Sequence, residues 1–133
     1  MISAIFVNLP VANLTRSVEF FGSLGFEFNP QFTDETSTCM LIGKDMYAML
    51  LEHEKYSSFI DKPIADAHKT NEVLVSLACE SIDDVKALCD KAFTAGARNY
   101  KESTDLGFMF AWGFEDLDGH IWELFYMNPE YVQ

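Results

Sequence analysis

The sequence repeats one arrangement of apolar runs twice, and this repetition limits the fold more than any other feature. In each half an apolar, β-rich run leads into an amphipathic helix, and three short strand candidates follow. The first module covers about residues 1–52 and the second about residues 71–128. We therefore expect an α+β fold for residues 1–133, a single domain built from two βαβββ modules.

Each predicted helix has its own start and stop signals. Asn13 caps the first helix, and Ser81, with Asp84 three residues later, forms a near capping box at the second. Gly25 and Gly96 end the two helices. The predicted strands cover about residues 2–11, 26–32, 38–43, 46–52, 72–79, 98–102, 107–114 and 120–127.

Charge and composition exclude several classes of function. The chain has 21 acidic and 9 basic residues and a net charge of −12, so we expect no nucleic-acid partner and no binding to an anionic membrane. No apolar run approaches the roughly 20 residues of a membrane span, and the N-terminus lacks the basic start of a signal peptide. The three cysteines are odd in number and lie in apolar stretches. These features predict reduced thiols and a cytoplasmic protein.

The last predicted strand carries a carboxylate among apolar residues. Asp116, Asp118 and Gly119 favour a turn, and strand alternation then places Glu123 on one face with Ile121 and Phe125. The other face carries His120, Trp122, Leu124 and Tyr126. A carboxylate in such a setting needs a metal, a hydrogen-bond donor or a water-filled pocket. An edge-strand glutamate pointing to solvent is the alternative.

Two segments resemble a known superfamily. Residues 6–27 resemble the opening of vicinal-oxygen-chelate proteins, and residues 115–124 are similar to their closing turn and strand, with Leu117 in place of proline. This superfamily includes glyoxalase I, bleomycin- and fosfomycin-resistance proteins and extradiol dioxygenases, and the closest likeness is to predicted lactoylglutathione-lyase-like proteins. The resemblance implies two βαβββ modules whose sheets curl into a cup, usually within a homodimer.

The resemblance also implies where a metal would bind. Metal-dependent members place one ligand on the first strand and one on the last strand of each module. In this chain Phe6, Leu50 and Leu74 match three of these positions, and only Glu123 matches the ligand pattern. We therefore expect no metal and no other cofactor. The alternative is an atypical Mg²⁺ or Mn²⁺ site, whose ligands would be Glu52, Glu72 and Glu123, helped by Asn8 or His53.

The aromatic residues suggest a small-molecule ligand. We expect a cup in which Glu123 acts on the ligand as the catalytic residue. The residues predicted to bind the ligand are Phe6, Asn8, Leu50, Glu52, Leu74, Phe110, Trp112 and Phe125. Core packing is the alternative for each aromatic residue. Residues 53–70 form a long connection that either lids the pocket, packs on a dimer mate or serves as a linker.

Two functions remain open. The first is an enzyme similar to glyoxalase, which isomerises or lyses a small carbonyl compound with Glu123 as general base. The second is a non-catalytic protein of the bleomycin-resistance type that binds its ligand between two subunits. Because the set of metal ligands is incomplete, the sequence favours either binding of a small molecule or a reaction that needs no metal.

Overall fold

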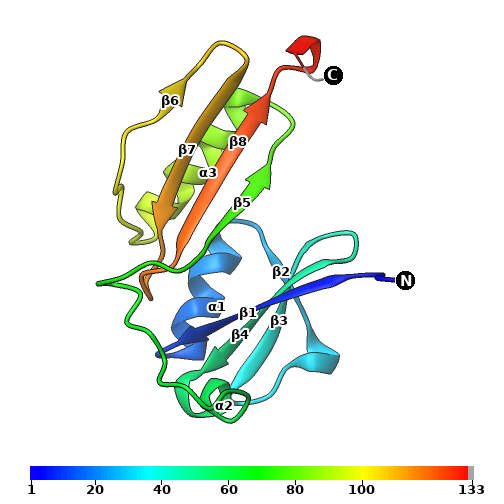
Figure 1. The fold of residues 1–133 in the computed structure, drawn as a ribbon, viewed down its shortest axis with the longest axis vertical. Helices are drawn as coiled ribbons and strands as arrows, with labels where there is room; N and C mark the ends of the chain where they lie inside the picture. The colour runs from blue at the N-terminus through cyan, green and yellow to red at the C-terminus, as the bar shows by residue number, and fades with distance from the viewer. Residues whose placement is uncertain (132–133) are drawn as a thin grey trace. The chain divides into compact units, whose positions relative to one another are not determined.

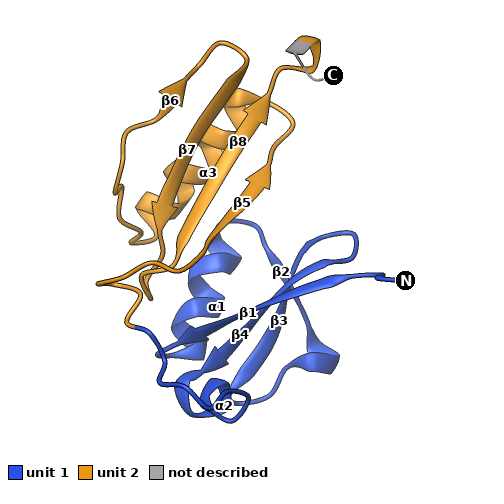
Figure 2. Ribbon diagram, viewed as in Figure 1, with its two compact units in different colours: residues 1–65 blue, residues 66–133 orange. Residues whose placement is uncertain are grey.

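A computed structural model provides the structure of the protein, and it describes residues 1–131 (Figure 1). The chain divides into two compact units, Met1–Ala65 and Asp66–Gln133 (Figure 2). Each unit contains one of the two repeated modules, with a four-stranded mixed sheet and a long helix. The expected α+β class and the two βαβββ modules are confirmed.

The first unit contains a sheet of order β1-β4-β3-β2. Its β1 and β4 are parallel, and the other pairs are antiparallel. The elements are β1 (Ile5–Val11), α1 (Leu14–Ser23), β2 (Glu27–Asn29), the 3₁₀ helix η1 (Pro30–Phe32), β3 (Ser37–Gly43), β4 (Met46–Glu52) and α2 (His53–Ser57).

The second unit repeats this topology in a sheet of order β5-β8-β7-β6. Its β5 and β8 are parallel, and its other strand pairs are antiparallel. The elements are β5 (Leu74–Ala78), α3 (Ile82–Thr94), β6 (Thr104–Asp105), β7 (Met109–Glu115), β8 (Ile121–Met127) and the 3₁₀ helix η2 (Pro129–Tyr131).

The helix caps follow the sequence signals. The Asn13 side chain accepts a hydrogen bond from the Arg16 amide at 3.0 Å, and the Ser81 hydroxyl accepts one from the Asp84 amide at 3.0 Å. Each capped helix covers one face of its own sheet: α1 packs on β4, and α3 packs on β7 and β8 (Figure 1). The opposite face of each sheet, which we call the open face, is not covered by that helix.

Three segments differ from the sequence prediction. Residues 30–32 form the 3₁₀ helix η1 rather than strand, because Pro30 suits the first turn of a helix and cannot donate to a sheet. Residues 98–102 contain one isolated bridge, between Arg98 and Glu115, and the edge strand β6 begins later, at Thr104. Residues 53–57 of the long connection form the short helix α2, which packs on β1 and β4.

Over the described residues, no helix is long and apolar enough to cross a lipid bilayer.

Candidate functional site

The open face of the first sheet is aromatic and apolar. Phe6 lies on this face and is 48% exposed, whereas Leu9 and Val11 point toward α1 and are 5% and 1% exposed. The Phe6 ring stacks on Tyr47 of the parallel neighbour β4, with ring centroids 4.5 Å apart. Asn8 shares the face with Phe6, and its side-chain amide donates to the Phe6 carbonyl at 3.2 Å.

Leu50 and Glu52 do not share this face, which corrects their predicted grouping with Phe6 and Asn8. The parallel register pairs Leu50 with Leu9, and Leu50 is 1% exposed in the core beneath α1. The residue of β4 that pairs with Asn8 on the open face is Met49. The prediction was wrong by one residue in register, and one residue moves a side chain to the other face.

Glu52 has a structural partner in the first unit. Its carboxylate oxygen Oε2 accepts a hydrogen bond from the backbone amide of Leu14 at 2.9 Å. Leu14 is the first residue of α1, where unpaired amides and the helix dipole both favour a negative charge. The contact therefore anchors the end of β4 to the start of α1.

Glu123 lies on the open face of the second sheet. Its neighbours in β8, Trp122 and Leu124, point toward α3 and are 1% and 0% exposed, which confirms the predicted alternation. The Ser76 hydroxyl of β5 donates to Glu123 Oε1 at 3.1 Å. Phe125 lies on the same face, two residues along the strand.

Phe110 and Trp112 lie on the face covered by α3, so the predicted grouping of these aromatic residues with Glu123 is wrong. The Trp112 ring packs edge-on against Phe93 of α3, with centroids 5.2 Å apart. The ammonium group of Lys86, also on α3, lies 5.6 Å from the centre of the Phe110 ring. Both aromatic residues therefore belong to the packing between β7 and α3, as the core alternative allowed.

Leu74 is placed on the open face with Glu123. It begins β5, pairs with Ile121, and is 44% exposed. Phe6 and Leu74 thus occupy corresponding positions, since each lies on the open face of the first strand of its module. Glu72 lies outside the sheet, in the exposed coil that precedes β5.

Tyr100 is a candidate site residue that the sequence analysis missed. A side-chain carbon added to Gly113 would lie 3.0 Å from the Tyr100 hydroxyl, so the hydroxyl sits above this glycine. Gly113 is the partner of Glu123 in the β7–β8 ladder. Burial raises the pKa of Tyr100, and the charges of Glu123 and then of Cys89 raise it further. The sequence offered two signals, the strand predicted over residues 98–102 and the glycine within β7, but it did not indicate that the two would meet beside Glu123.

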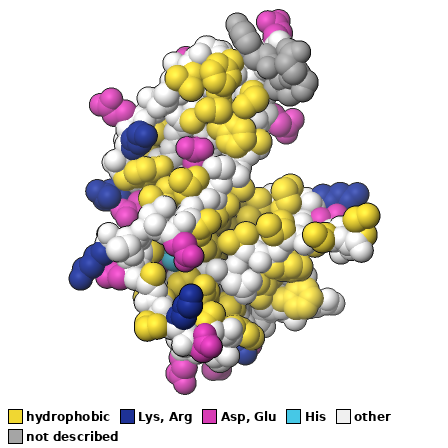
Figure 3. All heavy atoms as spheres, in the orientation of Figure 1, with side chains coloured by type: hydrophobic (Ala, Val, Ile, Leu, Met, Phe, Trp, Pro, Cys, Tyr) yellow, Lys and Arg dark blue, Asp and Glu magenta, His cyan; other side chains and the backbone are white. Residues whose placement is uncertain are grey.

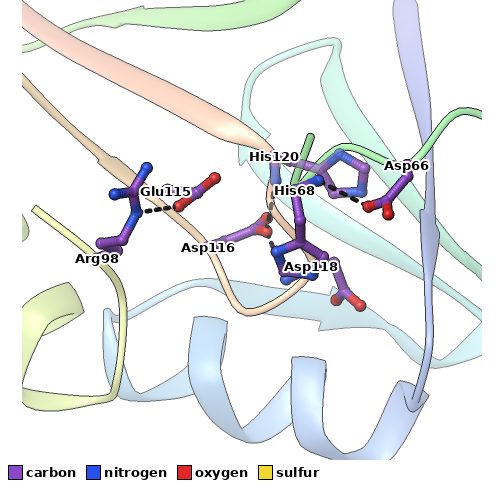
Figure 4. A network of polar contacts seen from close by, with 7 residues as sticks. All are labelled: Asp66, His68, Arg98, Glu115, Asp116, Asp118 and His120. Carbon is purple, nitrogen blue, oxygen red and sulfur yellow. Dashed lines mark hydrogen bonds and ion pairs between the residues drawn. The ribbon is translucent and has the colours of Figure 1, made fainter. Parts of the chain in front are cut away.

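A second carboxylate near this site is neutralised by an arginine. Glu115 is 9% exposed, and its carboxylate forms an ion pair with Arg98 across the isolated bridge between the two residues (Figure 4).

The turn before β8 is organised by the buried carboxylate of Asp116. This group accepts hydrogen bonds from the backbone amides of Asp118 and His120, at 2.9 and 3.0 Å (Figure 4), and from the Trp122 indole at 2.9 Å. Burial raises the pKa of Asp116, against the lowering effects of His120 and of the three N–H donors. The acidic turn is therefore part of the scaffold that positions β8.

Gly119 lets the chain pass close to this turn. Its φ is +88°, and an added side-chain carbon would lie 2.6 Å from the amide nitrogen of His68. Figure 4 shows His68 and Asp66 beside the turn, where the Asp66 carboxylate accepts from the His68 amide at 3.0 Å.

The donor chemistry of these positions does not fit the metal site that the resemblance implies. Phe6 and Leu74 carry no atom that can coordinate a cation, and neither does the Leu50 side chain buried beneath α1. Glu52 already accepts from a helix amide. Among residues 1–131, no three His, Cys, Asp or Glu side chains are grouped so that they could hold a metal ion.

The second unit also contains a cavity of about 60 Å³ that lies apart from Glu123. It is lined by residues of the α3 start, β6, β7 and β8, namely Ile82, Asp105, Gly107, Phe108, Met109, Phe110, Tyr126 and Asn128. Neither Glu123 nor any other predicted polar site residue lines this cavity, so we base the candidate site on the open face around Glu123 instead.

Comparison with known proteins agrees with this architecture. Residues 4–43 match the family described as bleomycin resistance protein-like N-terminal. A hypothetical protein from S. aureus is 29% identical with a TM-score of 0.80, and the alignment covers 95% of each chain. No curated protein matches the chain significantly.

Two further structures have names that refer to function. A glyoxalase/bleomycin resistance protein/dioxygenase family enzyme from Burkholderia phytofirmans PsJN is 16% identical over 92% of this chain and 96% of its own, with a TM-score of 0.75. A genomically encoded fosfomycin resistance protein from Listeria monocytogenes is 18% identical over 98% of each chain, with a TM-score of 0.70. The fold is thus glyoxalase-like. The match of residues 4–43 to the bleomycin resistance protein-like N-terminal family agrees with this fold.

Proposed function

We propose that this protein binds a small organic molecule on the open face of the second sheet, with Glu123 as the polar anchor. The observation that carries the proposal is the setting of this carboxylate. One oxygen accepts from Ser76, the Tyr100 hydroxyl lies over the adjacent Gly113, and Phe125 supplies apolar surface on the same face. A few polar groups placed within apolar surface are the usual composition of a small-molecule site.

The names of similar proteins support this class of ligand. They refer to resistance to bleomycin and to fosfomycin, which are small organic molecules. We infer that binding proceeds without the metal of the metal-dependent members. Two of their metal-ligand positions carry Phe6 and Leu74 here, and the Glu52 carboxylate already accepts a hydrogen bond from an amide of α1.

A thermal-shift screen of small metabolites and divalent metals tests the proposal. We expect at least one organic compound to raise the melting temperature, and we expect the Glu123→Gln variant to lose that response while remaining folded. Asp90→Asn is the matched control, because Asp90 is exposed on α3 and this change removes the same charge from the other side of the sheet. Equal responses of both variants to the compound would place the site elsewhere.

The second candidate function is a lyase or isomerase that acts on a small carbonyl compound. The Tyr100 hydroxyl beside Glu123 favours it, because a general base and a neutral proton donor close together suit proton transfer next to a carbonyl. We expect no metal-dependent turnover of the methylglyoxal–glutathione hemithioacetal. Turnover that a chelator abolishes and added Ni²⁺, Zn²⁺ or Mn²⁺ restores would contradict the metal-free proposal.

We further propose that the protein is a cytoplasmic homodimer. The open faces carry apolar side chains that a monomer exposes, including Phe6 at 48% and Leu74 at 44%. All three cysteines are free, as in a reducing compartment. Analytical ultracentrifugation should give the mass of two chains. A monomer mass that does not change with concentration would reject the dimer.

A further inference from the structure

One row of residues crosses the open face of the second sheet at the level of Glu123. The strand pairing aligns Ser76 of β5 with Glu123 of β8, and Glu123 with Gly113 of β7. The Tyr100 hydroxyl lies over Gly113 and completes the row at the edge. A side-chain carbon at position 113 would lie 2.4 Å from the Trp122 carbonyl oxygen and 3.0 Å from the Tyr100 hydroxyl, so glycine is needed where this row crosses β7.

The next row along the strands consists of an aromatic residue between two small residues. Phe125 pairs with Ala78 on one side and with Ala111 on the other. The two alanines carry only methyl groups, Ala78 is exposed and Phe125 is half-buried, so this row offers apolar surface to a flat ligand. Figure 3 shows that hydrophobic side chains gather on the visible face of the second unit, where β7 and β8 lie in Figure 1.

The charge on this face is negative and has no basic side chain on the central strands to neutralise it. Strands β5, β7 and β8 contain no lysine or arginine. Arg98 pairs with Glu115, so its charge is already matched. Glu123 accepts from Ser76 through Oε1, which leaves the second carboxylate oxygen to accept from a ligand.

We propose that these two rows form a subsite for an organic cation, a protonated amine or amidine carried on a flat apolar ring. The cationic group donates to Glu123 and to the Tyr100 hydroxyl, and the ring packs on Phe125 between the two alanines. This inference rests on the proposed function, because it names the class of ligand that the same face takes.

Tyr100 is the specificity residue of this subsite. Burial, and then the neighbouring carboxylate, keep the phenol neutral at physiological pH, since both raise the pKa of Tyr100. A neutral hydroxyl is able to accept a hydrogen bond from an ammonium group. An anionic ligand would meet the Glu123 charge directly and would be repelled.

The test compares three probes that differ only in the polar group: phenethylammonium, 2-phenylethanol and phenylacetate. Binding is followed by NMR shifts of the Ser76, Gly113 and Phe125 amides during titration. We expect phenethylammonium to bind about tenfold more tightly than the alcohol, as a charge-assisted hydrogen bond would give, and we expect phenylacetate to leave these amides unchanged.

Three variants test which side chains contact the ammonium group. Glu123→Gln should weaken phenethylammonium binding about tenfold and the alcohol much less, because only the ammonium forms an ion pair with the carboxylate. Tyr100→Phe should weaken it about threefold, the loss of one neutral hydrogen bond. The control Asp90→Asn should change it less than about twofold, since an exposed charge on the far side of the sheet is screened.

The outcomes separate the inference from the proposed function. If the alcohol or phenylacetate shifts the same amides as strongly as the ammonium does, the face binds small molecules and the cation proposal is wrong. If Glu123→Gln and Asp90→Asn weaken the ammonium equally, its attraction comes from the net charge of −12 and the subsite is rejected. If none of the three probes shifts these amides while a compound from the thermal screen does, the cation inference fails and the proposed function stands.

Discussion

The two sheets place different residues at one corresponding position. Asn8 and Ser76 each lie five residues before the helix cap of their module, on the first strand. Asn8 pairs with Met49 in the first sheet, whereas Ser76 pairs with Glu123 in the second. A thioether therefore lies where the other module has a carboxylate. The duplicated topology supplies two similar open faces, and only the second face has an acidic anchor.

The glutamates in the last strands of the two modules also differ in role. Glu52 and Glu123 both occur in the last strand of a module, yet Glu52 faces α1 and stabilises its first turn. Glu123 faces away from its helix and accepts from a serine hydroxyl. Residue type and strand position do not decide the role of a carboxylate. The face of the sheet does.

The largest expected effect concerns Asp116, the buried centre of the turn in the second unit. We expect Asp116→Ala to lower the free energy of unfolding by about 4 kcal/mol, because it leaves the Trp122 indole and two backbone amides without their acceptor. Both tryptophans, Trp112 and Trp122, lie in the second unit, so urea unfolding followed by tryptophan fluorescence reports on this change.

The matched control for this prediction lies in the first unit. Asp34 also accepts from the amides of two later residues, Thr36 and Ser37, but its turn is exposed. Asp34→Ala should therefore cost far less. An equal loss of stability in both variants would show that burial does not distinguish the two turns.

The next effect concerns the buried thiols at alkaline pH. Burial first, and then the charges of Asp90 and Cys79, raise the pKa of Cys89 in α3 from 9.0 to about 12. A raised pKa means that the folded state keeps its proton when the unfolded chain has lost it, so stability falls as pH rises from about 9 to about 12. The loss is on the order of 4 kcal/mol, since the two pKa values differ by about 3 and each pKa unit is worth about 1.4 kcal/mol.

The variant Cys89→Ala should flatten this alkaline loss, although it is less stable at neutral pH. In the first unit, burial is the sole cause of the raised pKa of Cys39. We expect Cys39→Ala to flatten the curve less, as measured by urea unfolding across the same pH range. The reverse order would mean that the acidic neighbours of Cys89 have no effect.

A smaller expected effect is the difference in stability between variants of Glu52 and Glu123. Glu52→Ala should destabilise the protein by about 1.5 kcal/mol through the lost contact with the α1 amide. Glu123→Ala should cost about 0.5 kcal/mol, because it removes one exposed hydrogen bond to Ser76. Amide hydrogen exchange in α1 should accelerate in the first variant and stay unchanged in the second. Faster exchange in α1 of the Glu123 variant would contradict the separate roles.

The smallest effect is the response of Asp34 to acid. Hydrogen bonds from the Thr36 amide and hydroxyl, followed by the Ser37 hydroxyl, lower the pKa of Asp34 below 3.8. A lowered pKa gives stability that is present above about pH 3.8 and is lost as pH falls through the folded-state value. Asp116, whose pKa is raised, should show the opposite sign. Carboxyl NMR titration should find Asp34 titrating below 3.8 and Asp116 above it.

Much of the fold was predictable because its signals are local. The caps at Asn13 and Ser81 are hydrogen bonds between residues three apart, so the sequence carries them in full. The alternation in β8 separates Glu123 from Trp122 for the same reason. The edge strand near residue 100 was misplaced, since β6 has only two residues and is defined by its pairing with β7 rather than by its own pattern.

Much of the candidate site was not predictable, because it depends on which strands pair and in which register. Alternation places Phe110 and Trp112 together on one face of β7, but it does not say that α3 covers this face. The alignment of Leu50 with Phe6 needed a cross-strand register, and an error of one residue inverts the face. Tyr100 lies in the predicted strand over residues 98–102, but the sequence does not indicate that its hydroxyl reaches Gly113 beside Glu123.

The sequence by itself determined the two modules, the capped helices and the isolated carboxylate at position 123, because each rests on residues within a few positions of one another. Only the tertiary structure decided that Ser76, Gly113 and Tyr100 surround this carboxylate. It also decided that Glu52 accepts a hydrogen bond from the first turn of α1. These contacts join strands far apart in the chain, and their geometry is set by the ladder register and by the side on which each helix packs.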